Sequence, residues 1–455
     1  DASRPLDLSR SLNLRPSPSP SPSPGTTQNK PAAMSKLCSA EKAVNHVNSN
    51  QRVFIHGGAA TPLALVDALV EESSRLHDVE LIHLHTSGEA NYASPEYEGT
   101  FRVANLFVGG NLRGRLDGDR VDYLPCFLSE IPQLFRSGRR ALDVAMVQVS
   151  PPDQRGYCSL GVSVDVARAA VDSAKVVIAQ VNRHMPRVHG DGFVHIDELD
   201  WLVEHDAPLP ESPPKPPSEE EQAIGHHAAE LIEDGATLQM GIGAVPDAVL
   251  ASLKGHRHLG VHTEMWSDGL LPLLDCGAVD NSLKVVHPGR TVSGFVVGTK
   301  AVYDFMDDNP TITQYDIGYV NRVSVINRNP KVTAINSAIE IDLTGQVCAD
   351  SIGHQVISGV GGQMDFMRGA MTSEGGKPII ALTSRTKKGA PRIVPTLKPG
   401  AGVVTTRAHV RFIITENGAV DLYGKTLNER AQLIFSIANP EEQDALERAW
   451  HETLI

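Results

Sequence analysis

The chain has 455 residues, 41% of them hydrophobic, which is enough to build the cores of two or three domains. Its 54 acidic and 41 basic side chains give a net charge of −13, which argues against nonspecific binding to nucleic acid or to an anionic membrane surface. No apolar run approaches the roughly 18 residues of a membrane span. The five scattered cysteines form no Cys-x-x-Cys pair, so neither a disulfide framework nor a cysteine zinc site is indicated. We expect no nucleic acid, no membrane and no metal as partners.

Residues 1–33 are not expected to fold, because Pro and Ser alternate from Pro16 to Pro24 and offer nothing to bury. The segment carries four basic and two acidic side chains, and such Arg- and Ser-rich, acid-poor stretches are typical of organelle transit peptides. We therefore expect a mitochondrial protein. The alternative is an ordinary unstructured tail on a cytoplasmic protein, since the prolines oppose an amphipathic helix. Met34 offers a second start that would delete the segment.

The first folded region, predicted as an N-terminal α/β domain over residues 34–207, alternates apolar runs with glycine turns and helical patterns. A helix is expected at Leu63–Glu72, after the turn at Gly57-Gly58. Strand, turn and helix in alternation predict a parallel sheet covered by helices. The expected strands or buried apolar runs are Val53–His56, Glu80–His85, Val144–Val149 and Ala174–Val181.

A proline-rich linker is predicted over residues 208–218, where six prolines lie between Pro208 and Pro217. Ser218-Glu-Glu-Glu221 is a capping-box pattern that predicts a helix ending near Asp234-Gly235. The second folded region, residues 219–455, repeats the strand–turn–helix scheme and carries a helix at Val245–Lys254. Its expected strands are Thr237–Met240, Gly260–Thr263, Lys284–His287, Val332–Asn336, Lys377–Leu382 and Val410–Thr415.

Glu264 is the first candidate for chemistry, because active sites of open α/β sheets lie where strands end. It follows an apolar strand and stands among Met265, Trp266 and Leu270. A carboxylate in a partly dry pocket is a better nucleophile than a hydrated one. The same sequence also fits a helix-capping or salt-bridged glutamate, so the residues alone leave both interpretations open.

The second candidate is the loop Gly359-Val360-Gly361-Gly362, whose three glycines let the backbone approach a ligand and present its N–H groups. Such donors stabilise an oxyanion when a carbonyl is attacked. A strained turn without a ligand is the alternative.

The third candidate is a basic segment, because eight Lys and Arg but no Asp or Glu lie between Gly375 and Thr415. Phosphates are natural partners of such a segment, with Lys387, Lys388 and Arg392 as the candidate contacts. A solvated basic face is the alternative.

Motifs for other chemistries are missing or incomplete. There is no Gly-x-Ser-x-Gly and no His-Glu-x-x-His. Gly241-Ile242-Gly243 lacks the third glycine of a dinucleotide fingerprint. His83 and His85 would share one face of a strand, where we expect packed or hydrogen-bonded rings rather than metal ligands.

Glu264, the glycine loop and the basic segment, together with further stretches of the sequence, resemble the acetyl-CoA hydrolase/transferase family. The resemblance is strongest to its 4-hydroxybutyrate (butyrate/acetate) CoA-transferase branch. The similarity runs from about Val53 to about Glu447. The matching stretches include Phe107-Val-Gly-Gly-Asn111, Gly156-Tyr-Cys-Ser-Leu-Gly161, Leu238-Gln-Met-Gly-Ile-Gly243, Thr263-Glu-Met265, Tyr319-Val-Asn321, Gly359-Val-Gly-Gly362 and Arg392-Ile-Val-Pro395.

The resemblance implies an α/β fold of two similar open domains of the CoA-transferase type, with the active site between them. It implies that Glu264 attacks the acyl-CoA carbonyl, that the Gly361 amide belongs to an oxyanion hole and that Asn321 is a second donor. The CoA pocket would be lined by Gln239, Met240, Gly241, Ile242, Gly243, Gly359, Val360 and Gly362.

The expected activity is that of a CoA-transferase exchanging CoA between a short-chain acyl-CoA and a carboxylate such as acetate, butyrate or 4-hydroxybutyrate. The implied reaction is ping-pong through a glutamyl-CoA thioester on Glu264, with CoA thioesters as substrates and no bound cofactor. A short-chain acyl-CoA hydrolase on the same scaffold is the main alternative, and a CoA-binding protein without turnover is a third. A homodimer is expected.

Overall fold

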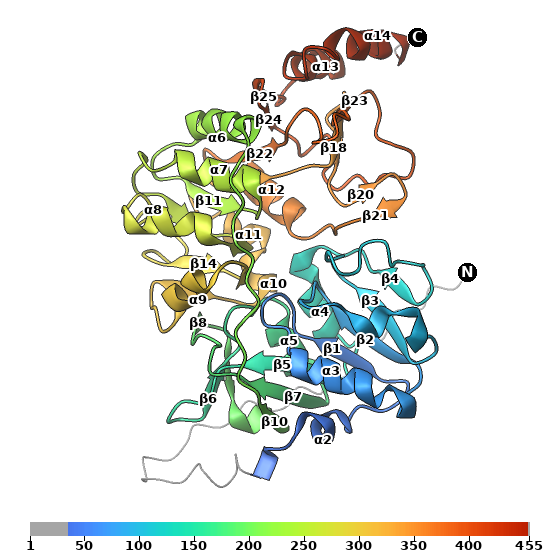
Figure 1. Cartoon of the computed structure of the whole chain (residues 1–455). Helices are drawn as coiled ribbons and strands as arrows, with labels where there is room; N and C mark the ends of the chain where they lie inside the picture. Colours follow the sequence, from blue (N-terminus) through green and yellow to red (C-terminus); the bar gives the residue numbers. More distant parts are fainter. Residues whose placement is uncertain (1–34, 454–455) are drawn as a thin grey trace, which may run out of the picture.

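Two sheets organise the chain, one in each half, as the computed structural model shows (Figure 1). The structure describes residues 35–453, so the predicted unfolded segment 1–33 lies outside the described residues. In Figure 1 the first half, blue to green, forms the lower part of the view, and most of the second half lies above it. None of the helices in residues 35–453 is long and apolar enough to cross a membrane.

The sheet of the first half has seven strands, all parallel to their neighbours, in the order β10-β7-β5-β1-β2-β3-β4. Strand order reverses beside β1, which pairs with both β2 and β5. The bounds are β1 Arg52–Ile55, β2 Val79–His83, β3 Phe101–Asn105, β4 Val121–Tyr123, β5 Val144–Val149, β7 Val176–Val181 and β10 Trp201–Glu204.

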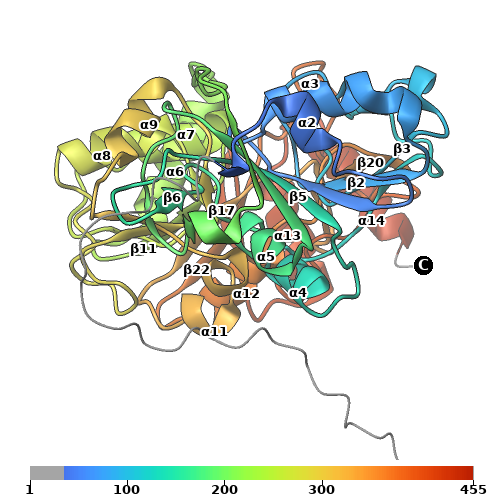
Figure 2. The ribbon, with the colours of Figure 1, turned by 90° about the horizontal axis from the view of Figure 1, so that it is seen from below.

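Helices cover both faces of this sheet (Figure 2). In β1, Val53 and Ile55 pack on the side of α2 and α3, while Phe54 points to the opposite face, toward the side of α4 and α5. This alternation is why the strand reads as continuously apolar. The bounds of the four helices are α2 Ala40–Val44, α3 Leu63–Glu71, α4 Ile131–Arg136 and α5 Ala167–Ser173.

The predicted linker joins β10 at one end of the molecule to α6, Glu219–Leu231, at the other (Figure 1). It lies against the second half, because the Tyr303 hydroxyl donates to the Pro210 carbonyl at 2.7 Å and Ser212 N donates to the Gly298 carbonyl at 2.9 Å. The capping box is present as predicted, with the Ser218 hydroxyl accepting from Glu221 N. The predicted domain boundaries themselves stay a prediction.

The sheet of the second half has the order β12-β11-β17-β22-β24-β25 and is parallel except for β25, which turns back beside β24. Its strands are β11 Thr237–Met240, β12 Gly260–Val261, β17 Thr333–Asn336, β22 Lys377–Ala381, β24 Phe412–Thr415 and β25 Gly418–Asp421. Its helices, besides α6, are α7 Ala244–Ser252, α8 Leu271–Asp275, α9 Lys300–Met306, α10 Ile317–Val320, α11 Val323–Ile326, α12 Gln363–Thr372, α13 Leu427–Ser436 and α14 Gln443–Thr453.

Short elements connect the two halves. One three-stranded sheet, β14-β16-β8, pairs two strands of the second half with one of the first.

The short strands are β6 Tyr157–Ser159, β8 His189–Gly190, β9 Phe193–His195, β13 Met265–Trp266, β14 Thr291–Ser293, β15 Phe295–Val296, β16 Ile312–Gln314, β18 Glu340–Asp342, β19 Val347–Cys348, β20 Ser351–Ile352, β21 Gln355–Val356 and β23 Ile393–Val394. Six 3-10 turns complete the described part: η1 Glu72–Arg75, η2 Asn91–Ala93, η3 Pro95–Tyr97, η4 Leu128–Glu130, η5 Ile196–Glu198 and η6 Asp268–Leu270.

One predicted strand was wrong. Residues Lys284–His287 form bends instead, because Val285 N and Val286 N donate to Asn329 Oδ1, at 3.1 and 2.9 Å, rather than to a neighbouring strand. Val285 is 58% exposed, whereas Lys284 turns inward and donates to the Val261 carbonyl at 2.7 Å. The other predicted strands are present, several of them one or two residues shorter than expected.

Candidate active site

Glu264 lies at the carboxyl end of the second sheet, between β12 and β13. The hydroxyl of the preceding Thr263 bonds to both backbone groups of Met240, which ends β11. The carbonyl of Glu264 itself accepts from Gly294 N at 2.9 Å. The main chain is therefore fixed on both sides of the carboxylate.

The Glu264 carboxylate is bound by amides rather than by a cation. Its Oε2 accepts from Asn321 Nδ2 at 3.2 Å, and the Gly362 N–H also donates to the side chain. Burial, together with the nearby charge of Asp365, raises the pKa of Glu264 to about 7, although the two amides oppose this shift. Near neutral pH the group is poised between acid and carboxylate.

Asn321 is fully buried just beyond α10, and its amide lies between two carboxylates. Its Nδ2 donates to Glu264 and, at 3.3 Å, to Asp365 Oδ2. Asp365, on α12, also accepts from the Ser129 hydroxyl at 2.8 Å and from Ser129 N at 3.2 Å, and burial raises its pKa to about 6. Ser129 belongs to the first half, so this network crosses between the halves.

The glycine loop lies directly against Glu264. Gly361 adopts φ of 57°, in the region that favours glycine. Its carbonyl accepts from Leu128 N at 3.0 Å, while its N–H has no acceptor within residues 35–453. At Gly362 a methyl group would overlap both Glu264 Oε2 and Asn321 Nδ2. Only a glycine allows this approach at position 362, and the preceding Gly361, with its unpaired N–H, lines the same cavity as Glu264.

A cavity of about 350 Å³ opens over Glu264 and is lined by both halves. Of the predicted site residues, the lining includes Gln239, Met240, Gly241, Ile242, Glu264, Gly359, Val360, Gly361 and Gly362. The first half contributes Leu84, His85, Phe107, Val108, Gly109, Gly110, Arg113 and Leu128.

The remaining predicted residues lie outside this lining. Gly243 precedes α7, with φ of 116°. Lys387 and Lys388 are exposed and form no ion pair within residues 35–453. Arg392 is partly buried, donates to the Ala338 carbonyl at 3.3 Å, and has its pKa lowered by burial. The role of Gly243 in the CoA pocket and the contacts of Lys387, Lys388 and Arg392 with CoA phosphates stay predictions.

The basic segment is partly neutralised by acidic side chains from elsewhere in the chain. Four of its eight cations form ion pairs, namely Lys377 with Glu233, Arg385 with Glu441 and Glu442, Lys398 with Glu340, and Arg411 with Asp421. A window without acidic residues in sequence is therefore not a free basic surface in space.

Sequence reasoning assigned no catalytic or binding role to several residues at the site. His85 lines the cavity, with its ring near those of Phe107 and Phe295. His83, in contrast, is buried and bonded to Tyr92 Oη at 3.0 Å, as expected for a packed histidine. For Asp365 the available signals were the glycines before it and the pair Asp365-Phe366, which resembles the family pattern. Nothing in sequence linked Ser129 to the second half.

The comparisons with known proteins agree with this architecture. Residues 27–210 match the family described as Acetyl-CoA hydrolase/transferase N-terminal domain, and residues 298–450 match its C-terminal domain. The structure of RipA from Yersinia pestis superposes with a TM-score of 0.90 at 35% identity, covering 94% of this chain and all of that one. A 4-hydroxybutyrate CoA-transferase from Porphyromonas gingivalis superposes with a TM-score of 0.81 at 37% identity, over 94% of this chain and all of that one.

The fold and the cavity between its halves thus define a two-domain α/β protein of the CoA-transferase type, as predicted. Two curated relatives identify the family. The "Succinyl-CoA:acetate/propanoyl-CoA:succinate CoA transferase" of Fasciola hepatica is 50% identical over 91% of this chain and 88% of its own. The "4-hydroxybutyrate coenzyme A transferase" of Clostridium kluyveri is 47% identical over 90% of this chain and 96% of its own. The chain belongs to the acetyl-CoA hydrolase/transferase family.

Proposed function

We propose that this protein is a CoA-transferase that moves CoA between a short-chain acyl-CoA and a carboxylate, with Glu264 as the nucleophile. One observation carries the proposal. Glu264 faces a cavity built by both halves, with two amide donors on its carboxylate, and Gly361, whose N–H has no acceptor within residues 35–453, lines the same cavity. The substrates named for the relatives, acetate, succinate, propanoyl-CoA and 4-hydroxybutyrate, support the same class of reaction.

In the first step a Glu264 oxygen attacks the acyl carbonyl carbon, the C–S bond breaks, and CoA leaves as a thiolate. The thiolate then attacks Cδ of the mixed anhydride, which releases the carboxylate and leaves a glutamyl-CoA thioester. The incoming carboxylate runs the steps in reverse. In each attack on Cδ negative charge develops on a Glu264 oxygen, which already faces Asn321 Nδ2 and the Gly362 N–H.

The Gly361 N–H is the candidate donor to the oxygen of the acyl carbonyl, since it faces no protein acceptor within the described residues. The proposed steps use no bound cofactor. The thioester must be kept from water, and the apolar walls at Leu84, Phe107, Met265 and Phe295 supply a largely dry surface for this.

Borohydride trapping tests the covalent step. The protein is incubated with acetyl-CoA and then with borohydride, which reduces the glutamyl-CoA thioester to a primary alcohol. Peptide mapping should find the modification at Glu264, dependent on acetyl-CoA. An unmodified Glu264 in protein that turns over acetyl-CoA would overturn the mechanism.

An exchange assay separates the transferase from the hydrolase. Labelled acetate should enter butyryl-CoA faster than free thiol is released. Thiol release that is faster and independent of the acceptor would favour the hydrolase, the activity named for a relative from Saccharomyces cerevisiae that is 25% identical.

We also propose that residues 1–33 direct the protein to mitochondria and that the protein forms a homodimer. The first proposal rests on the basic, acid-poor composition of the segment. A fluorescent protein fused behind residues 1–33 should co-localise with mitochondria, and diffuse fluorescence would contradict this. Light scattering at micromolar concentration should give twice the mass of the chain, and a monomer would contradict the dimer.

A further inference from the structure

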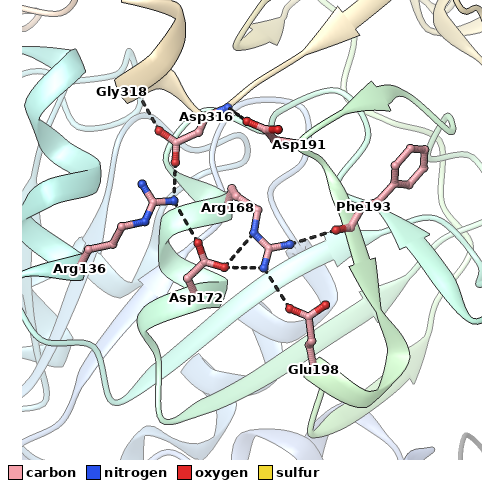
Figure 3. Close-up of polar contacts among 8 residues, drawn as sticks. All are labelled: Arg136, Arg168, Asp172, Asp191, Phe193, Glu198, Asp316 and Gly318. Carbon is pink, nitrogen blue, oxygen red and sulfur yellow. Dashed lines mark hydrogen bonds and ion pairs between the residues drawn. The ribbon is translucent and has the colours of Figure 1, made fainter. Parts of the chain in front are cut away.

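The one-turn helix α10 connects the active site to a network of charged side chains in the first half. The helix spans Ile317–Val320, and Asn321 follows it directly. At the other end lies Asp316, whose carboxylate belongs to the network of Arg136, Arg168, Asp172, Asp191, Glu198 and Asp316 shown in Figure 3. Four residues at a rise of about 1.5 Å each separate the network from the Asn321 backbone.

Asp316 holds the beginning of α10. Its Oδ1 caps the helix by accepting from Gly318 N at 2.8 Å, and its Oδ2 accepts from Arg136 Nη2 at 2.7 Å (Figure 3). Its own N–H donates to Asp191 Oδ2 at 3.2 Å. Of these partners, Arg136 is the one cation, and it comes from α4 in the first half.

Arg136 is itself held in place from within the first half. The same Nη2 donates to Asp172 Oδ2 at 3.0 Å, on α5. Arg168 fixes Asp172 through its Nε at 2.9 Å, and Arg168 also binds Glu198 Oε2 and the Phe193 carbonyl, each at 3.0 Å (Figure 3). Arg136 is therefore held from within the first half as well as by Asp316.

The end of α10 is anchored at the active site. Asn321 N donates to the Ile317 carbonyl at 2.9 Å, and His262 Nε2 bonds to the Val320 carbonyl at 2.8 Å. The helix also lies against the first half near Gly318, where an added methyl would be 3.3 Å from the Ser129 carbonyl. A shift of Asp316 would therefore move the helical turn that Asn321, with the amide that faces Glu264, directly follows.

We propose that Arg136 is a positioning residue of the reaction: through Asp316 it fixes α10, so that the Asn321 amide is aimed at the Glu264 carboxylate. Arg136 does not line the cavity, so it affects neither the shape nor the charge of the acyl-CoA pocket directly. The inference rests on the proposed roles of Glu264 and Asn321. Its expected signature is a loss in turnover without a loss in substrate binding.

The test compares Arg136→Met with Arg140→Met. Arg140 is a matched control, because the two arginines are similarly exposed and each pairs with a carboxylate that is 10% exposed. Arg136 is 38% exposed and pairs with Asp316. Arg140 is 35% exposed and pairs with Glu80. Arg136→Met should lower kcat for acetate exchange about tenfold to a hundredfold, with KM for acyl-CoA little changed. Arg140→Met should leave both constants near those of the unaltered protein. Arg136→Lys should restore much of the loss, because one nitrogen of Arg136 makes both contacts.

A double-mutant cycle with Asn321→Ala tests the route. If Arg136 acts through Asn321, Arg136→Met should have little further effect once the amide is gone. Asp172→Asn, which leaves the Arg136–Asp316 pair in place but weakens its support, serves as a second variant and should show a smaller loss in kcat. Equal behaviour of Arg136→Met and Arg140→Met, or independent effects of Arg136→Met and Asn321→Ala, would overturn the inference. Full turnover by Glu264→Gln would instead overturn the proposed function.

Discussion

Glu80 in the first half and Glu264 in the second half are both largely buried carboxylates, but their hydrogen-bond and ion-pair partners differ. Glu80, in the first sheet, is surrounded by arginines, with Arg52 at 2.6 Å, Arg140 at 3.2 Å and Arg102 at 3.7 Å. Glu264, at the end of the second sheet, forms no ion pair within residues 35–453 and is held by amides instead.

The difference separates a structural carboxylate from a reactive one. The arginines around Glu80 pair with its carboxylate and fix its position between strands. Amides orient Glu264 without supplying a full charge, so burial dominates and its pKa rises to about 7. An acyl transfer through the carboxylate makes it neutral in the anhydride and the thioester, and a strong cation beside it would oppose that change.

The largest expected effect is that of Glu264→Gln, which keeps the shape and removes the nucleophile. We expect the rate of acetate exchange to fall by at least about a thousandfold, as for other lost nucleophiles. Glu80→Gln is the control, and it should retain the exchange rate while losing stability, because Arg52 and Arg140 lose their carboxylate partner and Arg102 keeps only Asp78. Steady-state kinetics and thermal unfolding of both variants measure the two effects. Comparable exchange rates for the two variants would contradict the assignment of Glu264 as the reactive carboxylate.

A methyl group at Gly362 should have the next largest effect. The added methyl of Gly362→Ala would overlap Glu264 Oε2 and Asn321 Nδ2 and displace both. The backbone itself would stay unstrained, because φ at this position is −99°. We expect about a hundredfold lower kcat, because one misplaced donor at an oxyanion site costs that much. Gly255→Ala is the control, as its added methyl meets nothing within 4 Å. Equal kcat values for the two variants would show that contact with the glycine is not needed.

The sequence predicted the parts of the site that are local in the chain. Buried strands such as Val144–Val149 and Thr237–Met240 have the predicted bounds, because continuous apolar runs specify a strand covered on both faces. Glu264 and the glycine loop were recognisable because each carries its own signal, an acidic residue after an apolar strand and three glycines in four positions.

The parts that depend on contacts across the halves were not predictable. Ser129 and Asp365 are separated by 236 residues, and Arg136 and Asp316 by 180, so no local pattern joins them. The basic segment shows the same limit, because Glu233 and Glu340, which pair with Lys377 and Lys398, lie outside the acid-free window. The number of basic residues in a segment predicts a free basic surface only where no acidic side chains from elsewhere in the fold pair with them.

A third prediction concerns pH. Glu264 must be a carboxylate to attack, and burial raises its pKa to about 7. The rate constant kcat/KM should therefore be level above pH 8 and fall about tenfold per unit well below pH 7. Asn321→Ala removes a donor that lowers this pKa, so the acid limb should move to higher pH. An acid limb near pH 4.5 would mean that the free enzyme keeps Glu264 ionised throughout the neutral range.

The smallest expected effect is on folding stability, and it has the opposite sign for the two carboxylates. Between about pH 4.5 and pH 7 the unfolded chain ionises Glu264 while the folded protein keeps it protonated, so this group makes the free energy of unfolding decrease as pH rises. Glu264→Gln removes this loss and should be more stable than the unaltered protein at pH 8, by up to about 3 kcal/mol, with the difference shrinking toward pH 5. Urea unfolding at both pH values measures the difference, and Glu80→Gln should be less stable at pH 8. A gain for Glu264→Gln that is the same at pH 5 and pH 8 would place its cause in packing rather than in the buried charge.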